Sequence, residues 1–423
     1  MLKKSKVFVA VLLVLLLCFG SAATALANPI GPIVAPGENN PVQLSISKHL
    51  RLPVQTITPN ATFQFAATPV SVDGNTSAAA RATAPALSNL TVNFTTADTD
   101  PNNPVNNIMT IVKPTGNIFA GVTFPHAGIF IYEISEIRNT NPAIDGNAPH
   151  EVLTYSEDVF RITVYVANNA AGTATFVSAV GIYSVEEDED DEDGEVEQEK
   201  VGGLVFVNDF VRTNGAVDPE DPKPATESES TLQVSKQVAG DFASRTQYFD
   251  FGMTLNIPAL VQPIPPYYRA YVVEGNAVIN PADNAAAGLI GTDAGGSYIR
   301  ISTSGVTNFR LKDGQRLVFV DTPVGTSYTV EETAAIHYIP SLIVTRNGAA
   351  GAPIPGTLNT ALPSGTQLVG ELANGAAFTN TRDFVTPTGL NLNDLPFYGL
   401  ILLALGSLVT FVVVKVRKRR YDF

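Results

Sequence analysis

Short β-type segments separated by turn residues fill most of this chain, and they constrain its fold more than any other feature. Segments such as 128–137 (GIFIYEISEI) and 159–168 (VFRITVYVAN) are rich in Val, Ile, Phe, Thr and Tyr and alternate between apolar and polar residues. Clusters of Gly, Pro, Asn and Asp separate them, and no long helical pattern appears outside the two ends. The pattern predicts an all-β protein whose antiparallel strands pack as sandwiches.

A polar segment divides the body of the chain into two halves. Residues 213–230 (TNGAVDPEDPKPATESES) are rich in proline and acidic residues, which is typical of an interdomain linker. We therefore predict two tandem immunoglobulin-like β-sandwich domains, at residues 41–212 and 231–384. A second acidic segment, residues 186–199, predicts an exposed loop because like charges repel and stay solvated. Calcium capture is the alternative, although the segment lacks the ligand spacing of a calcium loop.

Three short patterns recur in the same order in both halves. The first is an apolar strand that ends in lysine, the second a Tyr-x-Ile/Val strand that leads to glutamate, and the third a Phe-x-Asn segment. Residues two apart on a strand share a face, so these polar side chains point the same way as their apolar neighbours. The sequence therefore predicts two buried polar trios, one in each half: Lys48, Glu136 and Asn208, then Lys236, Glu332 and Asn380.

A buried Lys, Glu and Asn together suit one reaction. Desolvation favours the neutral forms, which lowers the pKa of the lysine and raises that of the glutamate. The neutral amine can attack the asparagine carboxamide while the protonated glutamate hydrogen-bonds the amide oxygen and transfers protons, and ammonia leaves. The product is an intramolecular isopeptide bond. The alternative is that each lysine is a surface residue whose stem lies along apolar neighbours.

Both ends of the chain are apolar with basic flanks. Residues 1–27 combine three lysines, an apolar run too short to span a membrane and a final Ala-Leu-Ala, which is typical of a secretory signal peptide. Residues 395–414 carry no charge and are long enough to cross a bilayer. A basic tail follows, so the body of the chain is expected to face outward.

Composition argues against several functions. The only cysteine, Cys18, lies in the predicted signal peptide, so the mature chain forms no disulfide and no thiolate metal site. The net charge of −14 argues against binding to nucleic acid. Four histidines without a G-x-S-x-G, HExxH or phosphate-loop motif do not favour an enzyme that acts on external substrates. We expect no cofactor and no metal.

Several segments resemble the streptococcal-type pilin isopeptide-linkage family. They include FPHAGIFIYEISE (124–136), LQVSKQVAG (232–240) and FTNTRDFVTPTG (378–389). The resemblance covers most of residues 41–390, and the domain order is similar to that of a two-domain, sortase-assembled major pilin of Gram-positive bacteria. It implies a Lys48–Asn208 bond assisted by Glu136 and a Lys236–Asn380 bond assisted by Glu332. It also implies a structural protein rather than an enzyme, because each bond forms once within the chain.

Residues 385–423 resemble a sortase sorting signal: VTPTG, a polar spacer, an apolar helix and a basic tail. The resemblance implies that a sortase cysteine attacks the Thr388 carbonyl and releases Gly389 onward, while the helix tethers the chain to the membrane. The common signal begins with Leu-Pro, whereas Val-Thr precedes Pro387 here. Lys200, just before the last strand of the first half, resembles in position the lysine that receives the next subunit. The alternative is a solvated lysine beside the acidic loop.

The resemblance also implies a location and partners. The chain would be secreted and held at the cell wall of a Gram-positive bacterium, with sortase and either neighbouring pilin subunits or peptidoglycan as partners. Minor pilins or an adhesin would be further partners. The alternative is a monomeric wall-anchored adhesin or stalk protein, which would be attached only through Thr388.

Overall fold

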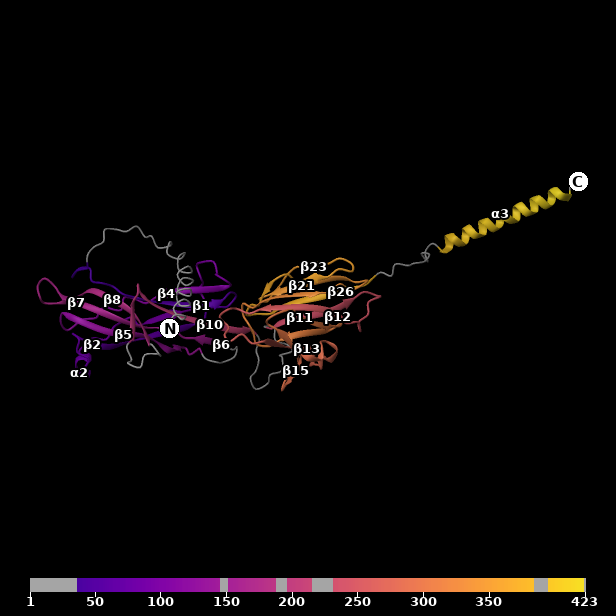
Figure 1. Cartoon of the computed structure of the whole chain (residues 1–423). Helices are drawn as coiled ribbons and strands as arrows, with labels where there is room; N and C mark the ends of the chain where they lie inside the picture. Colours follow the sequence, from indigo (N-terminus) through magenta and orange to yellow (C-terminus); the bar gives the residue numbers. More distant parts are fainter. Residues whose placement is uncertain (1–35, 145–150, 188–195, 215–230, 384–394, 422–423) are drawn as a thin grey trace, which may run out of the picture.

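The computed structural model describes residues 36–144, 151–187, 196–214, 231–383 and 395–421. Strands predominate, and their buried side chains form two large hydrophobic cores. We call residues 36–214 the first module and residues 231–383 the second module; Figure 1 shows them in indigo to magenta and in orange, respectively. The predicted signal peptide and the predicted sortase site at Thr388 and Gly389 lie outside the described residues.

The first module consists of two sheets. One has the order β4-β1-β10, with β6 also paired to β10, and the other has the order β3-β2-β5-β7-β8-β9. Alternate residues of β1 and β5 are buried, as the period-two pattern predicts. The strands are β1 (Ile46–Pro53), β2 (Ala61–Val72), β3 (Thr91–Phe94), β4 (Ile108–Pro114), β5 (Gly128–Asn141), β6 (Glu151–Thr154), β7 (Val159–Asn168), β8 (Thr175–Glu187), β9 (Val196–Lys200) and β10 (Leu204–Asn214).

The second module also has two sheets, with the orders β15-β16-β13-β18-β11-β26-β21-β22 and β17-β12-β20-β24. Its strands are β11 (Leu232–Ala239), β12 (Phe249–Asn256), β13 (Tyr267–Glu274), β14 (Ala277–Val278), β15 (Ile290–Asp293), β16 (Gly296–Ser302), β17 (Thr307–Leu311), β18 (Gln315–Phe319), β19 (Thr322–Pro323), β20 (Ser327–Glu332), β21 (Ile339–Arg346), β22 (Ala349–Ala350), β23 (Ile354–Pro355), β24 (Leu362–Pro363), β25 (Gln367–Leu368) and β26 (Asn374–Thr381).

Helices are few in the described residues. The long helix α3 (Leu395–Tyr421) includes a stretch, Pro396–Lys418, that is long and apolar enough to cross a membrane. The prediction of an all-β chain with an apolar C-terminal helix is therefore confirmed. A single-turn helix, α2 (Ala78–Arg81), and two 3-10 turns, η1 (Pro281–Asp283) and η2 (Ala287–Leu289), were not predicted, because elements this short leave no periodic signal.

Strand pairing extends further along the chain than its composition indicates. Thr213 and Asn214, the first two residues of the predicted linker, end β10 and pair antiparallel with β19 of the second module. Strands β8 and β9 likewise extend into the predicted acidic loop, with Glu186 opposite Glu197. In both places the strand continues because its backbone hydrogen-bonds to a neighbouring strand. Local composition does not reveal which strand that neighbour is.

The two modules meet at the end of β10. Arg212 Nη1 donates to Glu371 Oε1 of the second module at 2.6 Å, and Asn214 Nδ2 donates to the Gly370 carbonyl at 2.6 Å. Gly325 has a φ of +83°, and a Cβ there would lie 2.5 Å from Pro53 Cβ of the first module. Only glycine fits this close approach. The modules are therefore joined by the Arg212–Glu371 ion pair, the β10–β19 strand pairing and the close contact at Gly325.

Candidate functional site

Each module places its lysine and asparagine on adjacent parallel strands with the same register. In the first module β1 pairs with β10, and Lys48 lies opposite Phe206, two residues before Asn208. In the second module β11 pairs with β26, and Lys236 lies opposite Phe378, two residues before Asn380. Because alternate residues share a face, lysine and asparagine point into the same core.

The glutamate reaches each site from the opposite sheet. Glu136 lies on β5, opposite Phe65 of β2, and Glu332 lies on β20, opposite Phe251 of β12. All six polar residues are buried, and both lysines have no exposed surface. The structure thus brings together the three predicted residues in each module, across the space between two sheets.

Both trios converge on one carboxylate oxygen. In the first module Lys48 Nζ lies 2.8 Å from Glu136 Oε1, and Asn208 Nδ2 donates to the same oxygen at 2.9 Å. In the second module Lys236 Nζ lies 2.8 Å from Glu332 Oε1, and Asn380 Nδ2 donates to that oxygen at 2.5 Å. The carboxyl group therefore contacts both the amine and the carboxamide in each module.

A Phe-x-Phe strand completes both sites. Lys48 Nζ lies 4.9 Å from the ring centre of Phe63, and Lys236 Nζ lies 4.1 Å from that of Phe249. The next residues in phase, Phe65 and Phe251, pack against the phenylalanine of the Phe-x-Asn segment at 5.0 and 5.2 Å between ring centres. Sequence reasoning missed these phenylalanines, although the recurrence of Phe-x-Phe after each lysine was a usable signal.

Burial among aromatic rings favours the uncharged forms of the site groups. Desolvation lowers the pKa of Lys48 to about 8, and that of Lys236 to about 8, against the opposing attraction of the neighbouring carboxylate. Desolvation also raises the pKa of Glu136 and of Glu332, although the adjacent lysine acts in the opposite direction. A neutral amine beside a protonated carboxyl is thus favoured more than it would be in water.

The carboxamide orientation differs from the sequence-based expectation. The glutamate was expected to hydrogen-bond the amide oxygen, but in both modules the asparagine nitrogen faces the glutamate. The oxygen of Asn208 accepts instead from the Ser156 backbone N–H at 2.8 Å. The oxygen of Asn380 has no hydrogen-bond partner among the residues that the structure describes.

The other predicted residues lie at the surface or outside the structure's described ranges. Glu133, next to the site but on the opposite face of β5, has a side chain that is 40% exposed, and Glu331 is exposed. Lys200 ends β9, the outer strand of its sheet, and is also exposed. The structure brings no predicted partner to Lys200.

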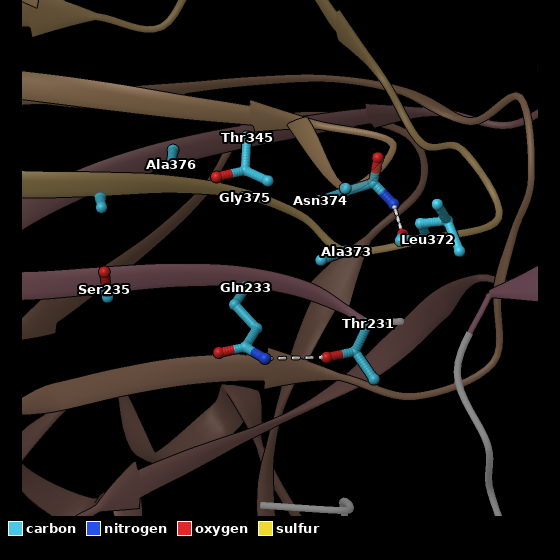
Figure 2. Close-up of a pocket in the computed structure, with 11 residues that line it drawn as sticks. Thr231, Gln233, Ser235, Thr345, Leu372, Ala373, Asn374, Gly375 and Ala376 are labelled. Carbon is cyan, nitrogen blue, oxygen red and sulfur yellow. Dashed lines mark hydrogen bonds between the residues drawn. The ribbon is translucent and has the colours of Figure 1, made fainter. Parts of the chain in front are cut away.

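A surface pocket of about 710 Å³ lies elsewhere on the second module, over β11, β21 and β26 (Figure 2). The side chains that line it are uncharged and mostly small, and they include those of Thr231, Gln233, Ser235 and Asn374. Two of its polar groups are satisfied locally, because Gln233 Nε2 donates to Thr231 Oγ1 and Asn374 Nδ2 donates to the Leu372 carbonyl. Its lining residues include no charged or titratable side chain, unlike the buried trios.

Fold and sites together define a class: a tandem all-β protein in which each module buries one Lys–Glu–Asn trio between its two sheets, with the lysine on the first strand and the asparagine on the last. More particularly, residues 44–211 match the family described as "Spy0128-like isopeptide containing domain". Residues 230–382 match a second family, described as a domain of unknown function (DUF7601). A curated pilin from Streptococcus pyogenes serotype M1 is 25% identical over 382 residues, which is 89% of this chain and 92% of that protein.

Solved structures give a weaker likeness. The major pilin from Streptococcus pyogenes is 21% identical, with 82% of this chain and 100% of that chain covered and a TM-score of 0.31. A pilus-presented adhesin, Spy0125 (Cpa), is 14% identical, with 53% of this chain and 36% of that chain covered and a TM-score of 0.24. Scores this low support no further conclusion, so the similarity to pilins rests on the sequence matches.

Proposed function

We propose that this chain is a structural subunit of a covalently assembled pilus on the surface of a Gram-positive bacterium. The observation that carries the proposal is the same Lys–Glu–Asn trio, buried in both modules and set in the same register. The family of the first module and the similarity to a curated pilin support it. The chain is not an enzyme in this proposal, because its chemistry takes place once in each module and on itself.

The trios are proposed to form the isopeptide bonds Lys48–Asn208 and Lys236–Asn380. The neutral Nζ attacks the asparagine Cγ, a proton moves from Nζ to the glutamate carboxyl group, and that group gives a proton to Nδ2. The Cγ–Nδ2 bond then breaks and ammonia leaves, so one amide replaces another. Glu136 and Glu332 end protonated, as they began, and are not consumed.

These bonds would make each module resistant to tension. Each bond would tie the first strand of its module to the last, and those strands are adjacent and parallel. Force along the chain would then act on a covalent link rather than on a ladder of hydrogen bonds. We further propose that both modules are immunoglobulin-like sandwiches with the predicted boundaries, residues 41–212 and 231–384, except that β10 extends the first module to Asn214.

Export, tethering and sorting are proposed from the two ends of the chain. Residues 1–27 would direct secretion, and α3 would hold the chain at the membrane, because its residues 395–414 are uncharged and of spanning length and the remainder of the helix is basic. Sortase would then cleave between Thr388 and Gly389 and pass the acyl group to a neighbouring subunit or to peptidoglycan. Other pilins or an adhesin would join the same assembly.

Lys200 is the proposed acceptor of the next subunit. Between residues 28 and 384 the chain has six lysines, and two of them, Lys48 and Lys236, are buried in the trios. Lys113 and Lys312 are half-buried and lie in ion pairs with Asp98 and Glu274. Two lysines remain: Lys200, which is exposed on an edge strand, and Lys223, which lies outside the described residues.

The intact mass of recombinant residues 28–384 tests the isopeptide chemistry. Each bond releases one ammonia, about 17 Da, so we expect a deficit of about 34 Da from the sequence mass. Glu136→Ala should restore one ammonia mass and Glu332→Ala the other, whereas Glu133→Ala and Glu331→Ala, on the outer face of the same strands, should restore neither. A mass equal to that of the sequence would leave an anchored β-protein without internal cross-links.

A further inference from the structure

We propose that the backbone N–H of Ser156 is the oxyanion donor for bond formation in the first module. It touches Asn208 Oδ1, the atom on which negative charge develops when Lys48 attacks. The inference rests on the isopeptide chemistry proposed above and deepens it, because it gives the two modules different means of stabilising the same intermediate.

A short turn holds this N–H at the site. Ser156 N lies 2.8 Å from Asn208 Oδ1 and 3.3 Å from Glu136 Oε2, and the residue is buried. Ser156 Oγ donates to Asp158 Oδ2 at 2.5 Å and accepts from the Asp158 backbone N–H at 3.3 Å. The donor is therefore fixed before the reaction begins, which is what makes an oxyanion donor effective.

Strand pairing explains why the turn lies there. β6 runs antiparallel to β10, and its last residue, Thr154, is opposite Asp209. Residues 155–158 then leave this sheet, and β7 begins at Val159 in the other sheet. The crossing carries the Ser156 amide past the side chain of Asn208, next to Asp209 on β10.

The second module has no equivalent donor among its described residues. Asn380 Oδ1 and Glu332 Oε2 are buried without a hydrogen-bond partner there. The strand that follows the glutamate strand, β21, does not turn away but continues along β26. Its residue opposite Asn380 is Pro340, which has no N–H to donate.

Because of this difference, the groups that stabilise the intermediate and transfer the protons are not the same in the two modules. In the first module the Ser156 N–H holds the charge on Oδ1, while Glu136, which faces Nδ2, is free to protonate the leaving nitrogen. In the second module Glu332 must both stabilise the intermediate and move the protons. Loss of a single oxyanion donor slows acyl chemistry by about 100-fold or more, so the first bond should form much faster than the second.

An amide-to-ester replacement at Ser156 is the sharpest test. Residues 28–384 are synthesised by cell-free translation with the α-hydroxy acid analogue of serine at position 156, which replaces the N–H by oxygen and keeps the side chain. Samples are quenched in denaturant over time, and digestion with mass spectrometry counts the Lys48–Asn208 and Lys236–Asn380 cross-linked peptides separately. The matched control is the same replacement at Glu157, one residue further along.

With the ester at position 156, we expect the Lys48–Asn208 bond to form about 100-fold more slowly. With the ester at position 157, it should form at the normal rate. The Lys236–Asn380 bond should form at the normal rate in both variants. An unchanged rate of the first bond with the ester at 156 would overturn the inference. Absence of both cross-links in the unmodified chain would instead overturn the proposed function. Limited proteolysis of the two esters in a Lys48→Ala background, where the first bond cannot form, checks that slow bonding does not reflect misfolding of the first module.

Discussion

Lys48 and Asn208 lie on adjacent parallel strands, two residues out of register, and the carboxyl group of Glu136 contacts both side chains. A parallel pair places the first and last strands of a module side by side with the same direction. A covalent bond at this point therefore closes nearly the whole module into a ring. The second module repeats the relationship with Lys236 and Asn380, although its strand order differs.

Removal of the assisting carboxyl should lower stability through loss of this ring. Glu136→Ala is expected to prevent the Lys48–Asn208 bond, which would close a loop of about 160 residues and is worth roughly 5 kcal/mol in chain-entropy models. For a module of this size that corresponds to a decrease in Tm of about 10–20 °C. Calorimetry and trypsin resistance measure the effect.

The matched control for this prediction lies on the same strand. The side chain of Glu133 is 40% exposed on the opposite face of β5 and pairs with Arg161 at 3.3 Å, so Glu133→Ala should lower the free energy of unfolding by no more than about 1 kcal/mol. In the second module Glu332→Ala and the exposed Glu331→Ala form the same comparison. Equal losses from Glu136→Ala and Glu133→Ala would contradict a special role for the buried carboxyl.

The rate of bond formation should have a bell-shaped pH dependence. The reactive pair carries one proton, because the amine must be neutral and the carboxyl must still donate. Below the raised pKa of Glu136 the pair holds a second proton and Lys48 is charged, so attack stops. Above the lowered Lys48 pKa of about 8, the pair has lost its proton and the leaving nitrogen is not protonated.

Initial rates of ammonia loss, followed by mass from pH 5 to pH 10 after refolding of unbonded chain, check this profile. We expect a fall on the alkaline side near pH 8 in both modules, because Lys236 also has a pKa of about 8. A rate that continues to rise through pH 10 would indicate that deprotonation of the lysine is the only requirement and that the carboxyl transfers no proton.

Local patterns predicted which side chains point inward, but they could not predict which strands are neighbours. Period two alone places Lys48, Glu136 and Asn208 in the core, because a strand's faces follow from its sequence. The parallel register of β1 and β10 depends on contacts between residues far apart in the chain. The Ser156 donor is a backbone group that every residue except proline carries, so only the turn after β6 reveals its role.

The contact between the modules could not be predicted from the sequence either. The contribution of its Arg212–Glu371 ion pair can be tested. Glu371→Ala removes the acceptor of Arg212 Nη1, whose side chain is 15% exposed, and of the Ile57 backbone N–H. Arg212 Nε still donates to Glu151 of the first module, so loss of the Glu371 carboxylate should weaken the contact between the modules by roughly 1 kcal/mol. We expect a broader distribution of distances between the modules, with the stability of each module nearly unchanged.

Single-molecule energy transfer measures this distribution. The only cysteine of the chain is Cys18, so residues 28–384 accept one label in each module, at cysteines introduced at the exposed Thr173 and Val306. Glu331→Ala, an exposed charge in the second module away from Arg212, is the control. A distribution as narrow with Glu371→Ala as with the control would show that the β10–β19 ladder and Asn214 suffice to fix the junction.

Polymerisation should depend on one exposed lysine. The edge strand β9 presents Lys200 to solvent, whereas the site lysines are buried and Lys113 and Lys312 are held by carboxylates. We therefore expect Lys200→Ala to abolish the ladder of detergent-resistant covalent oligomers in cells that express the matching sortase, with no change in monomer mass deficit or Tm. Lys223→Ala, which removes the remaining lysine, should leave the ladder intact. Loss of the ladder with Lys223→Ala alone would move the linkage there, and its persistence when both are replaced would move it to Lys113 or Lys312. Absence of a ladder from the unmodified chain would favour a chain that is attached singly through Thr388.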